Sequence, residues 1–218
     1  MQNSEEFIDT SNSAAPVRGF LHRPAVPGTD CLILTHGAGA NCRSLLLTTL
    51  ADAFCAAGLT VLRCDLPFRQ SRPFGPPPRG SAERDQEGLQ AAVASMRHHT
   101  QGRVFLGGHS YGGRQASMLA ANQPGLVERL LLLSYPLHPP KRPAEPRTNH
   151  FPALQVPSFF VHGMRDSFGS IVEMEEALKI IPAPTNLMPI PGAGHELMTN
   201  RTGNELAGQV VTGFLSFT

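Results

Sequence analysis

The chain of 218 residues lacks the features that mark several classes of protein. Its formal net charge is only +1, which gives no electrostatic reason to expect nucleic acid or a membrane surface as a partner. No apolar run approaches the roughly 18 residues of a membrane-spanning helix. The first residues are polar and acidic, unlike a secretion signal. We therefore expect a cytoplasmic protein that binds neither nucleic acid nor membrane.

Cysteine is also scarce. The four cysteines are Cys31, Cys42, Cys55 and Cys64, and their spacing matches no zinc or thioredoxin-like pattern. Three of them, Cys31, Cys55 and Cys64, lie within apolar stretches, where free thiols are commonly buried. We therefore expect buried free thiols, with no metal site and no cofactor.

Short apolar runs recur along the chain. They lie at residues 31–37, 60–67, 103–110, 128–136 and 158–166, with a weaker run at 185–195. The runs are continuously apolar and do not alternate with polar residues, which favours parallel strands buried on both faces of a sheet. A further segment, 17–24, is compatible with an antiparallel strand at the edge of that sheet.

Helical periodicity fills the intervals between these runs. Apolar residues recur at helical spacing over the stretches 46–57, 89–96, 171–181 and 206–214. Gly58 follows the first stretch, as is typical of a helix C-terminus. The repeated alternation of strand and helix predicts an α/β fold with a doubly wound, mostly parallel sheet that carries helices on both faces. At this length we expect a single domain over residues 1–218.

Two proline-rich segments interrupt the alternation, at residues 66–80 and 136–157. Each follows a predicted strand, so we expect both at the carboxyl edge of the sheet, where open α/β folds bind ligands. The second could hold one short helix at most, so we expect no cap domain. Arg69, Arg72 and Arg79 in the first segment could attract an acidic substrate or could simply be solvated.

One glycine-flanked serine lies where a predicted strand meets a predicted helix. Residues 108–112 read Gly-His-Ser-Tyr-Gly, and a run of small residues with helical character follows. In a G-x-S-x-G turn the glycines leave room for the close approach of strand and helix, and the serine oxygen is exposed at the tip. Ser110 is therefore a candidate nucleophile, although short glycine–serine patterns also occur in ordinary bends.

A serine hydroxyl is a poor nucleophile until a base removes its proton. His195 follows the last predicted strand and precedes the last helix, so its loop can fold back over the sheet edge. His36, His109 and His162 lie at strand ends beside glycine, where we expect them to orient loops. The remaining histidines lie in polar, helix-end or proline-rich segments: His22, His98, His99, His138 and His150. His195 is therefore the predicted base.

The third group must be an acid that holds the imidazole in one tautomer. Asp166 ends the strand before His195, whereas the strand after the nucleophile's helix ends in Leu-Ser-Tyr-Pro, without a carboxylate. Asp65 comes before the serine in the chain, and Glu196 is too close to His195 in sequence to turn back onto its ring. Asp166 is favoured largely by this elimination.

Negative charge that develops on a substrate oxygen needs two backbone N–H donors. One should be the amide of Tyr111, which follows Ser110 at the start of a helix whose dipole also favours the charge. The other should come from the glycine-rich loop 35–41, with Ala38 as the predicted donor. That loop could instead be a flexible turn or a phosphate cradle. It lacks the Gly-Lys-Ser/Thr of a P-loop and the G-x-G-x-x-G of dinucleotide folds.

Taken together, these motifs resemble the α/β-hydrolase superfamily over essentially the whole chain. The segments that carry the resemblance are "THGAGAN", "RCDLPF", "GGHSYGG", "SYPLHPP", "VHGMRDSFGS" and "GAGHEL". More narrowly, the sequence is similar to the small, capless, dienelactone-hydrolase-like group that includes testis-expressed hydrolase-like proteins. The order Ser110, Asp166, His195 is the order of the triad in α/β-hydrolases. Dienelactone hydrolase itself uses a cysteine where this chain has Ser110, so that reaction is not implied.

The predicted function is that of a serine hydrolase, with carboxylesterase-like acyl hydrolysis through an acyl-enzyme. The expected partner is a small-molecule ester, or an acyl group displayed on something larger, and the oligomeric state is left open. One alternative is a thioesterase, a peptidase or a perhalogenating oxidase that uses the same triad. Another is a non-catalytic binding or scaffold module that keeps the fold, which loss of a triad residue would indicate, and none is missing here.

Overall fold

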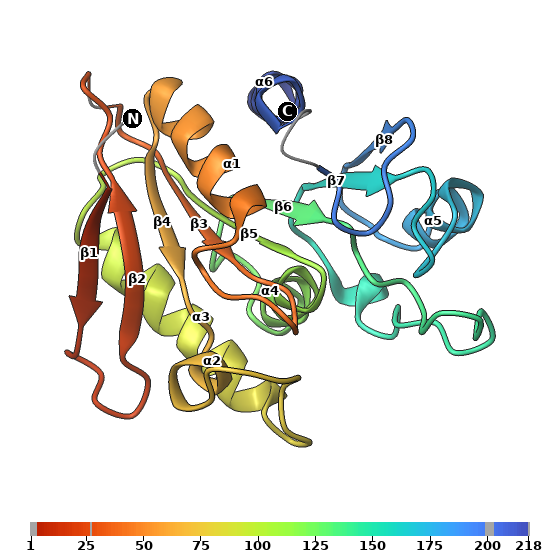
Figure 1. Ribbon diagram of the computed structural model, residues 1–218, viewed down its shortest axis with the longest axis horizontal. Coiled ribbons are helices and arrows are strands. Elements are labelled where there is room, and N and C mark those ends of the chain that lie inside the picture. Colours follow the sequence, from red (N-terminus) through yellow and green to blue (C-terminus); the bar gives the residue numbers. More distant parts are fainter. Residues whose placement is uncertain (1–3, 27, 199–202, 218) are drawn as a thin grey trace.

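The computed structural model describes residues 4–26, 28–198 and 203–217, and its centre is an eight-stranded sheet (Figure 1). The strands are β1 (Ser4–Asp9), β2 (Val17–His22), β3 (Cys31–Thr35), β4 (Thr60–Cys64), β5 (Val104–His109), β6 (Arg129–Leu133), β7 (Ser158–Gly163) and β8 (Thr185–Ile190). Their spatial order is β1-β2-β4-β3-β5-β6-β7-β8. β1 and β2 run antiparallel to their neighbours, and the strands from β4 to β8 pair in parallel.

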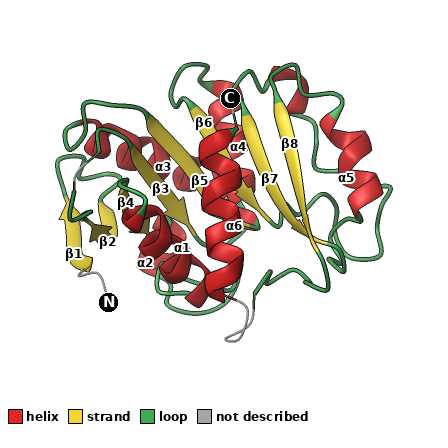
Figure 2. Ribbon diagram, turned by 90° about the horizontal axis from the view of Figure 1, so that it is seen from above, coloured by secondary structure: helices red, strands yellow, loops and turns green. Residues whose placement is uncertain are grey.

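Helices cover both faces of this sheet, as predicted. They are α1 (Leu45–Ala56), α2 (Pro67–Ser71), α3 (Ala82–Arg97), α4 (Tyr111–Asn122), α5 (Ile171–Leu178) and α6 (Gly203–Ser216), with a 3-10 turn at Phe151–Ala153. Seen from above, α1 and α6 lie in front of the sheet and α3 and α4 behind it (Figure 2). Within the described residues, no helix combines the length and apolar character that crossing a membrane requires.

The continuous apolar character of the strands follows from this double coverage. In β3, Leu32 and Leu34 pack in the core beneath α1 and α6. Cys31 and Ile33, which alternate with them, pack in the core beneath α3, α4 and α5. Successive side chains of a strand point to opposite faces, so a strand covered on both sides is apolar at every position.

Local sequence chemistry fixes several helix ends. Gly58 takes a φ of 96° just after α1, a conformation that favours glycine and ends the helix. At the start of α5, Ser170 and Glu173 form a reciprocal capping box. The predicted helical stretch 171–181 is too long, because α5 ends at Leu178 and Ile181 is buried beyond it.

The edge of the sheet differs from the prediction. The segment 17–24 does contain an antiparallel strand, but β1 pairs along the whole of β2 and lies outside it (Figure 1). The apolar pattern did not predict β1 because few side chains of this strand are buried. Of its residues only Phe7 packs against the core, while Ile8 is 53% exposed. An edge strand exposed on its outer side does not need a continuous apolar run.

The two proline-rich segments follow β4 and β6, at the carboxyl ends of the parallel strands. The first begins with α2, which the sequence analysis did not predict, and continues as irregular chain. The second contains only the 3-10 turn at Phe151–Ala153. All of residues 134–157 are described, so no cap domain is inserted between β6 and β7.

All four cysteines are free and buried, as expected. Burial raises the pKa of the Cys31 and Cys42 thiols to about 12 and also raises those of Cys55 and Cys64. The thiols therefore remain protonated at neutral pH.

The end of β5 and the start of α4 approach one another with no side chain between them. A Cβ atom added to Gly108 would lie 2.7 Å from the carbonyl carbon of Gly112. A Cβ atom added to Gly112 would lie 2.5 Å from the carbonyl oxygen of His36 in the neighbouring loop. Both neighbours are backbone atoms, so only glycine permits this approach.

We predict that Gly112→Ala lowers the free energy of unfolding by about 1–3 kcal/mol, because the added methyl group must displace backbone. The matched control is Gly208→Ala in α6, where an added Cβ meets no atom within 4 Å. That variant should be neutral or stabilised by up to about 1 kcal/mol, since alanine is the better helix former. Urea unfolding measures both, and an unchanged midpoint for Gly112→Ala would contradict the packing argument.

Candidate active site

Ser110 occupies a strained turn between β5 and α4. Its φ is 51° and its ψ is −116°, a combination that residues other than glycine seldom adopt. Its amide donates to the carbonyl of Leu133 (2.8 Å), and its own carbonyl accepts from the amide of Arg114 (3.0 Å). The Ser110 hydroxyl makes no hydrogen bond that caps α4. The backbone is therefore held on both sides while the side chain points away from the helix.

Three side chains form a hydrogen-bonded chain at this turn. Ser110 Oγ lies 2.8 Å from His195 Nε2, and His195 Nδ1 lies 2.8 Å from Asp166 Oδ2. An ionised carboxylate can only accept, so Nδ1 carries the proton and Nε2 accepts the hydroxyl proton of Ser110. The structure thus brings together the serine, histidine and aspartate that the sequence analysis selected.

The Asp166 side chain is fully buried. Burial alone would raise its pKa, but hydrogen bonds from the His195 ring and from the Phe168 amide (2.8 Å) hold the pKa below its ordinary value. His162 approaches the same carboxylate, with Nε2 3.8 Å from Oδ2. The carboxylate is therefore ionised and can hold the His195 ring in one tautomer.

The rings of Phe168 and His109 hold His195 in place. The sequence analysis did not assign either ring to the site. The Phe168 ring lies against the imidazole, with centroids 4.2 Å apart and an interplanar angle of 31°. His109 Nε2 donates to the backbone carbonyl of His195 (2.8 Å). Burial lowers the pKa of His109, so its ring is neutral. The only sequence signals for these roles are that Phe168 is two residues after Asp166 and His109 is next to Ser110.

His36 and His162, like His109, hold loops by hydrogen bonds to backbone carbonyls, as the sequence analysis expected. His36 Nδ1 donates to the carbonyl of Gly37 (2.8 Å), and His162 Nε2 donates to that of Gly169 (2.8 Å). Burial lowers the pKa of both rings.

The loop that contains Ala38, one of the two predicted oxyanion donors, lies beside Ser110. A Cβ atom added to Gly37 would be 3.4 Å from Ser110 Cβ. Among the described residues, neither the Ala38 amide nor the Tyr111 amide has a hydrogen-bond partner. Both N–H groups are thus available to a ligand, and their role as oxyanion donors stays a prediction.

A buried carboxylate anchors the residue after Ser110. The Tyr111 hydroxyl donates to Asp85 Oδ2 (2.7 Å), and the Phe68 amide donates to Asp85 Oδ1 (3.0 Å). Asp85 is fully buried in α3. Burial raises the pKa of Tyr111, so its hydroxyl stays protonated and able to donate. This carboxylate joins α2, α3 and the first turn of α4, and so fixes the turn that carries Ser110.

Arg69 is neither solvated nor directed at a ligand, so both readings of this residue from the sequence are wrong. Its side chain is buried at the start of the proline-rich segment. It donates to the carbonyls of Ala38 and Ala40 (2.8 Å each) and of Arg72 and Gly75 (2.9 Å each). These four carbonyls replace water around the guanidinium. Arg69 therefore holds the loop of the predicted oxyanion donor against the proline-rich segment.

The alternative acids lie away from the imidazole of His195. Asp65 accepts from the Cys42 amide (2.7 Å) and lies 3.5 Å from His36 Nε2. Glu196 is exposed. In the part of the chain that the structure describes, no group of three or more histidine, cysteine, aspartate or glutamate side chains is placed to hold a metal ion.

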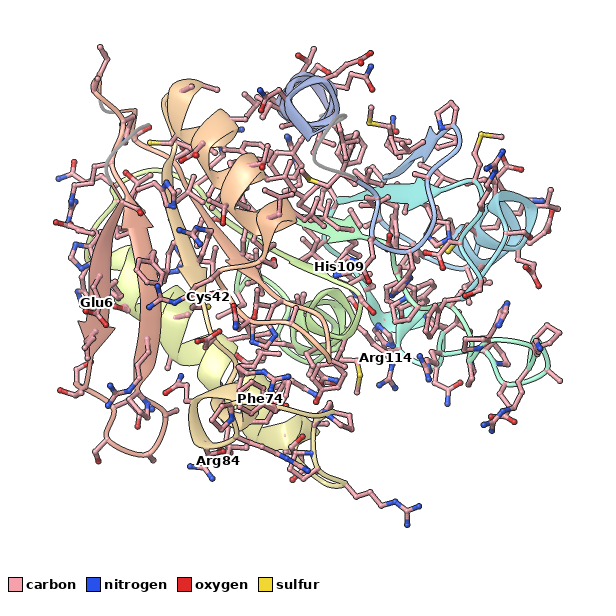
Figure 3. All side chains as sticks on the ribbon, in the orientation of Figure 1. Glu6, Cys42, Phe74, Arg84, His109 and Arg114 are labelled. Atoms are coloured by element: carbon pink, nitrogen blue, oxygen red, sulfur yellow. The ribbon has the colours of Figure 1, made fainter. Side chains whose placement is uncertain are left out.

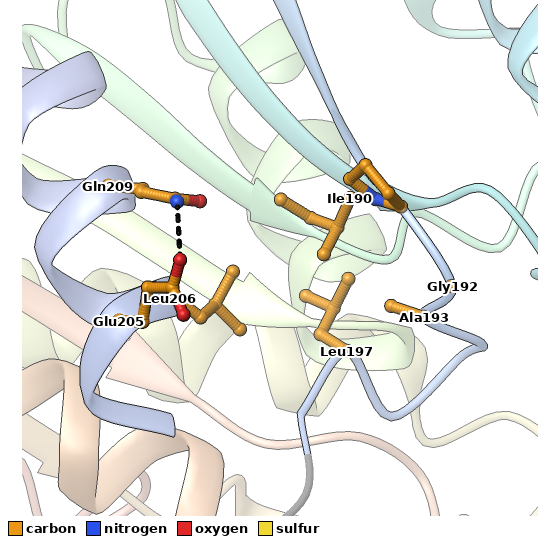
Figure 4. A pocket seen from close by; sticks show the side chains of 8 residues that line it. Ile190, Gly192, Ala193, Leu197, Glu205, Leu206 and Gln209 are labelled. Atoms are coloured by element: carbon orange, nitrogen blue, oxygen red, sulfur yellow. Dashed lines mark hydrogen bonds between the residues drawn. The ribbon is translucent and has the colours of Figure 1, made fainter. Parts of the chain in front are cut away.

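The loop that carries His195 also forms one wall of a cavity of about 510 Å³ (Figure 4). The opposite wall is α6, where Glu205 and Gln209 face each other across a 3.5 Å hydrogen bond. Ile190, Leu197 and Leu206 make most of the lining apolar.

Comparison with known families gives one match over most of the chain. The model of the alpha/beta hydrolase domain family matches residues 28–214. This span contains the three hydrogen-bonded residues Ser110, His195 and Asp166. It also contains both predicted oxyanion donors.

Solved structures show the same fold. An alpha-beta serine hydrolase homologue from Coxiella burnetii is 21% identical, with 98% of each chain covered and a TM-score of 0.78. The dienelactone hydrolase from Anabaena variabilis is 22% identical, with 100% of this chain and 99% of that chain covered and a TM-score of 0.76. A serine hydrolase without a lid from Xanthomonas campestris is 16% identical, with 99% and 95% covered and a TM-score of 0.74.

We predict that Arg69→Met lowers the free energy of unfolding by about 3 kcal/mol or more, because several buried carbonyls lose their donor at once. Amide hydrogen exchange over residues 36–41 should also become faster. Arg72→Met removes an exposed arginine from the same segment and is the matched control. Equal stability of the two variants would show that Arg69 does not hold the loop.

We predict that the protein loses stability as the pH falls below about 6.5, the ordinary pKa of histidine. Burial lowers the pKa of His36, His109 and His162, and lowers that of His150 to about 4. The unfolded chain therefore binds more protons than the folded chain once the pH drops through the ordinary value. The contribution of these neutral rings to the free energy of unfolding is therefore complete above about pH 6.5. It decreases as the pH falls from about 6.5 to the lower pKa values of the folded state.

Urea unfolding at a series of pH values between 7.5 and 5 measures this effect. His150→Gln removes one of the titrating groups and should make the dependence on pH shallower. A free energy of unfolding that stays constant over this range would contradict the assignment of neutral, buried rings.

Proposed function

Since the chain belongs to the α/β-hydrolase family, we propose that it is a serine hydrolase that cleaves carboxylic esters through a covalent acyl-enzyme. The observation that supports this most directly is the hydrogen-bonded chain Ser110–His195–Asp166 at a strained strand-to-helix turn. A nucleophile within reach of a base that is itself oriented by a third group is the arrangement that covalent catalysis needs.

In the first half of the reaction His195 Nε2 takes the proton of Ser110 while Oγ attacks the ester carbonyl. The ionised Asp166 stabilises the imidazolium that forms. The amides of Ala38 and Tyr111 donate to the oxyanion, and one such donor is worth about 10²–10³ in rate in a well-studied enzyme. The imidazolium then passes its proton to the leaving alcohol, and the acyl group stays on Ser110.

In the second half water replaces the alcohol. His195 takes a proton from the water, whose oxygen attacks the acyl carbon. The same two amides stabilise the second oxyanion. Collapse of this intermediate returns the proton to Ser110 and releases the carboxylic acid, so no cofactor is consumed.

Access to the site supports an ester substrate without a deep binding tunnel. Ser110 is half-buried, and the stretch between β6 and β7 carries no cap domain. A small ester, or an acyl group displayed on a larger molecule, can therefore approach from the carboxyl edge of the sheet.

We predict that Ser110→Ala abolishes turnover of p-nitrophenyl esters and labelling by a fluorophosphonate probe, because the nucleophile is removed. Asp166→Asn should lower kcat by about 10⁴, as the corresponding change does in a chymotrypsin-type enzyme. Release of p-nitrophenol and in-gel fluorescence are the measurements.

Ser167→Ala is the matched control, since Ser167 is an exposed serine next to Asp166. It should keep full activity and labelling. Full esterase activity in Ser110→Ala would refute the assignment of the nucleophile. Folded wild-type protein that neither reacts with the probe nor turns over any ester would favour a non-catalytic binding module.

A further inference from the structure

Among the described residues, two arginines on the two sides of the contact between α4 and the chain after β6 make no ion pair with a carboxylate. Arg114 is in the first turn of α4, and its amide donates to the carbonyl of Ser110 (3.0 Å), so its backbone lies next to that of the serine. Figure 3 shows Arg114 at the side of α4 that faces the connection between β6 and β7, residues 134–157. Arg147 belongs to that connection.

Arg114 has unused hydrogen-bonding capacity. Among the described residues its guanidinium makes no ion pair, and its Nε is buried without a hydrogen-bond partner. A buried donor left unpaired costs about 1–3 kcal/mol, so such groups in native proteins usually have a further partner.

Arg147 is held in place by its backbone, not by its charge. Its amide donates to the carbonyl of Leu137 (2.7 Å), and its carbonyl accepts from the Tyr135 hydroxyl (2.6 Å). Among the residues that the structure describes, its guanidinium makes a single long contact of 3.5 Å, with the carbonyl of Pro136. Burial, and next the positive charge of Arg114, lower the pKa of Arg147. The two like charges are thus close enough to affect each other.

The groups around the two arginines do not neutralise them. His150 packs between α4 and the connection, where its Nε2 lies 2.8 Å from Ser117 Oγ. Burial and the charge of Arg114 lower the pKa of His150 to about 4, so the ring is neutral. The acid of the connection, Glu145, is exposed and is paired with Arg142 (3.2 Å); its charge raises the pKa of Arg147, but by less than burial and the charge of Arg114 lower it.

We propose that Arg114 and Arg147 form a subsite for an anionic group of the substrate, next to the bond that Ser110 attacks. The preferred esters then carry a carboxylate or a phosphate on a short chain from the scissile carbonyl. Guanidinium groups suit this task, because their planar fork donates two parallel hydrogen bonds to either anion. This inference rests on the proposed function, since the subsite is placed relative to the serine that attacks the ester carbonyl.

The test compares two esters that differ only in charge. Mono-p-nitrophenyl adipate ends in a carboxylate where p-nitrophenyl hexanoate ends in a methyl group. The wild-type protein should show the higher kcat/KM for the adipate ester. In Arg114→Gln and in Arg147→Gln the ratio of kcat/KM for the adipate ester to kcat/KM for the hexanoate ester should fall about 10- to 100-fold. This factor corresponds to the free energy of a hydrogen bond to a charged group. The ratio cancels any general loss of activity.

Arg142→Gln is the matched control, because it removes an arginine of the same connection whose charge is already paired. Its ratio should equal that of the wild type, and Arg147→Lys should recover part of the lost preference. A wild-type protein that hydrolyses both esters equally well would overturn the proposal. So would a loss of preference in Arg142→Gln as large as that in Arg147→Gln.

A binding measurement separates this proposal from the proposed function. Calorimetry with adipate and with inorganic phosphate on Ser110→Ala needs no turnover. Binding that disappears when Arg114→Gln is added would support the subsite even if no ester were cleaved, and the tighter of the two anions would identify the group it accepts. Ester hydrolysis without any preference for charge, combined with no binding of either anion, would refute the subsite and leave the serine hydrolase intact.

Discussion

The close approach of β5 to the first turn of α4 constrains the rest of the site. Gly108 and Gly112 leave no side chain at this contact, so the chain can reverse between them only by straining Ser110. The strain turns the Ser110 hydroxyl out of the helix and leaves the Tyr111 amide at the helix start. Arg114 follows one turn later. The positions of the candidate nucleophile, of a predicted oxyanion donor and of an arginine are thus tied to one backbone contact.

Around this turn the loops are held mainly by neutral hydrogen bonds and a buried guanidinium. Three imidazoles at strand ends, those of His36, His109 and His162, donate to backbone carbonyls of the surrounding loops. Arg69 does the same with four carbonyls. The ionised group at the centre is Asp166, whose buried carboxylate faces His195. Outside the hydrogen-bonded chain of Ser110, His195 and Asp166, neutral imidazoles and the side chains of Arg69 and Asp85 hold the loops and the turn in place.

The sequence predicted the parts of this structure that depend on local pattern. Continuous apolar runs predicted β3 to β7 because strands buried on both faces require them, while the edge strand β8, which has no buried residue, gave only a weaker run. Position and chain order selected Ser110, Asp166 and His195. The strand β1 was missed because an edge strand buries little. The role of Arg69 was missed because the sequence after a strand does not distinguish an arginine that is solvated from one that donates to four backbone carbonyls. Phe168 is placed against His195 only by the fold of two distant loops.

The burial of the four cysteines also has a chemical consequence. The thiolate is the form that attacks alkylating and oxidising reagents, and the raised pKa values of the thiols keep the thiolate population very small. Cys31 and Cys64 lie in adjacent central strands, β3 and β4, and Cys55 lies in α1 against the sheet. A reagent can reach these sulfurs only when strands and helices separate. The rate at which Cys31, Cys55 and Cys64 are modified therefore reports how often the strands and helices around them separate.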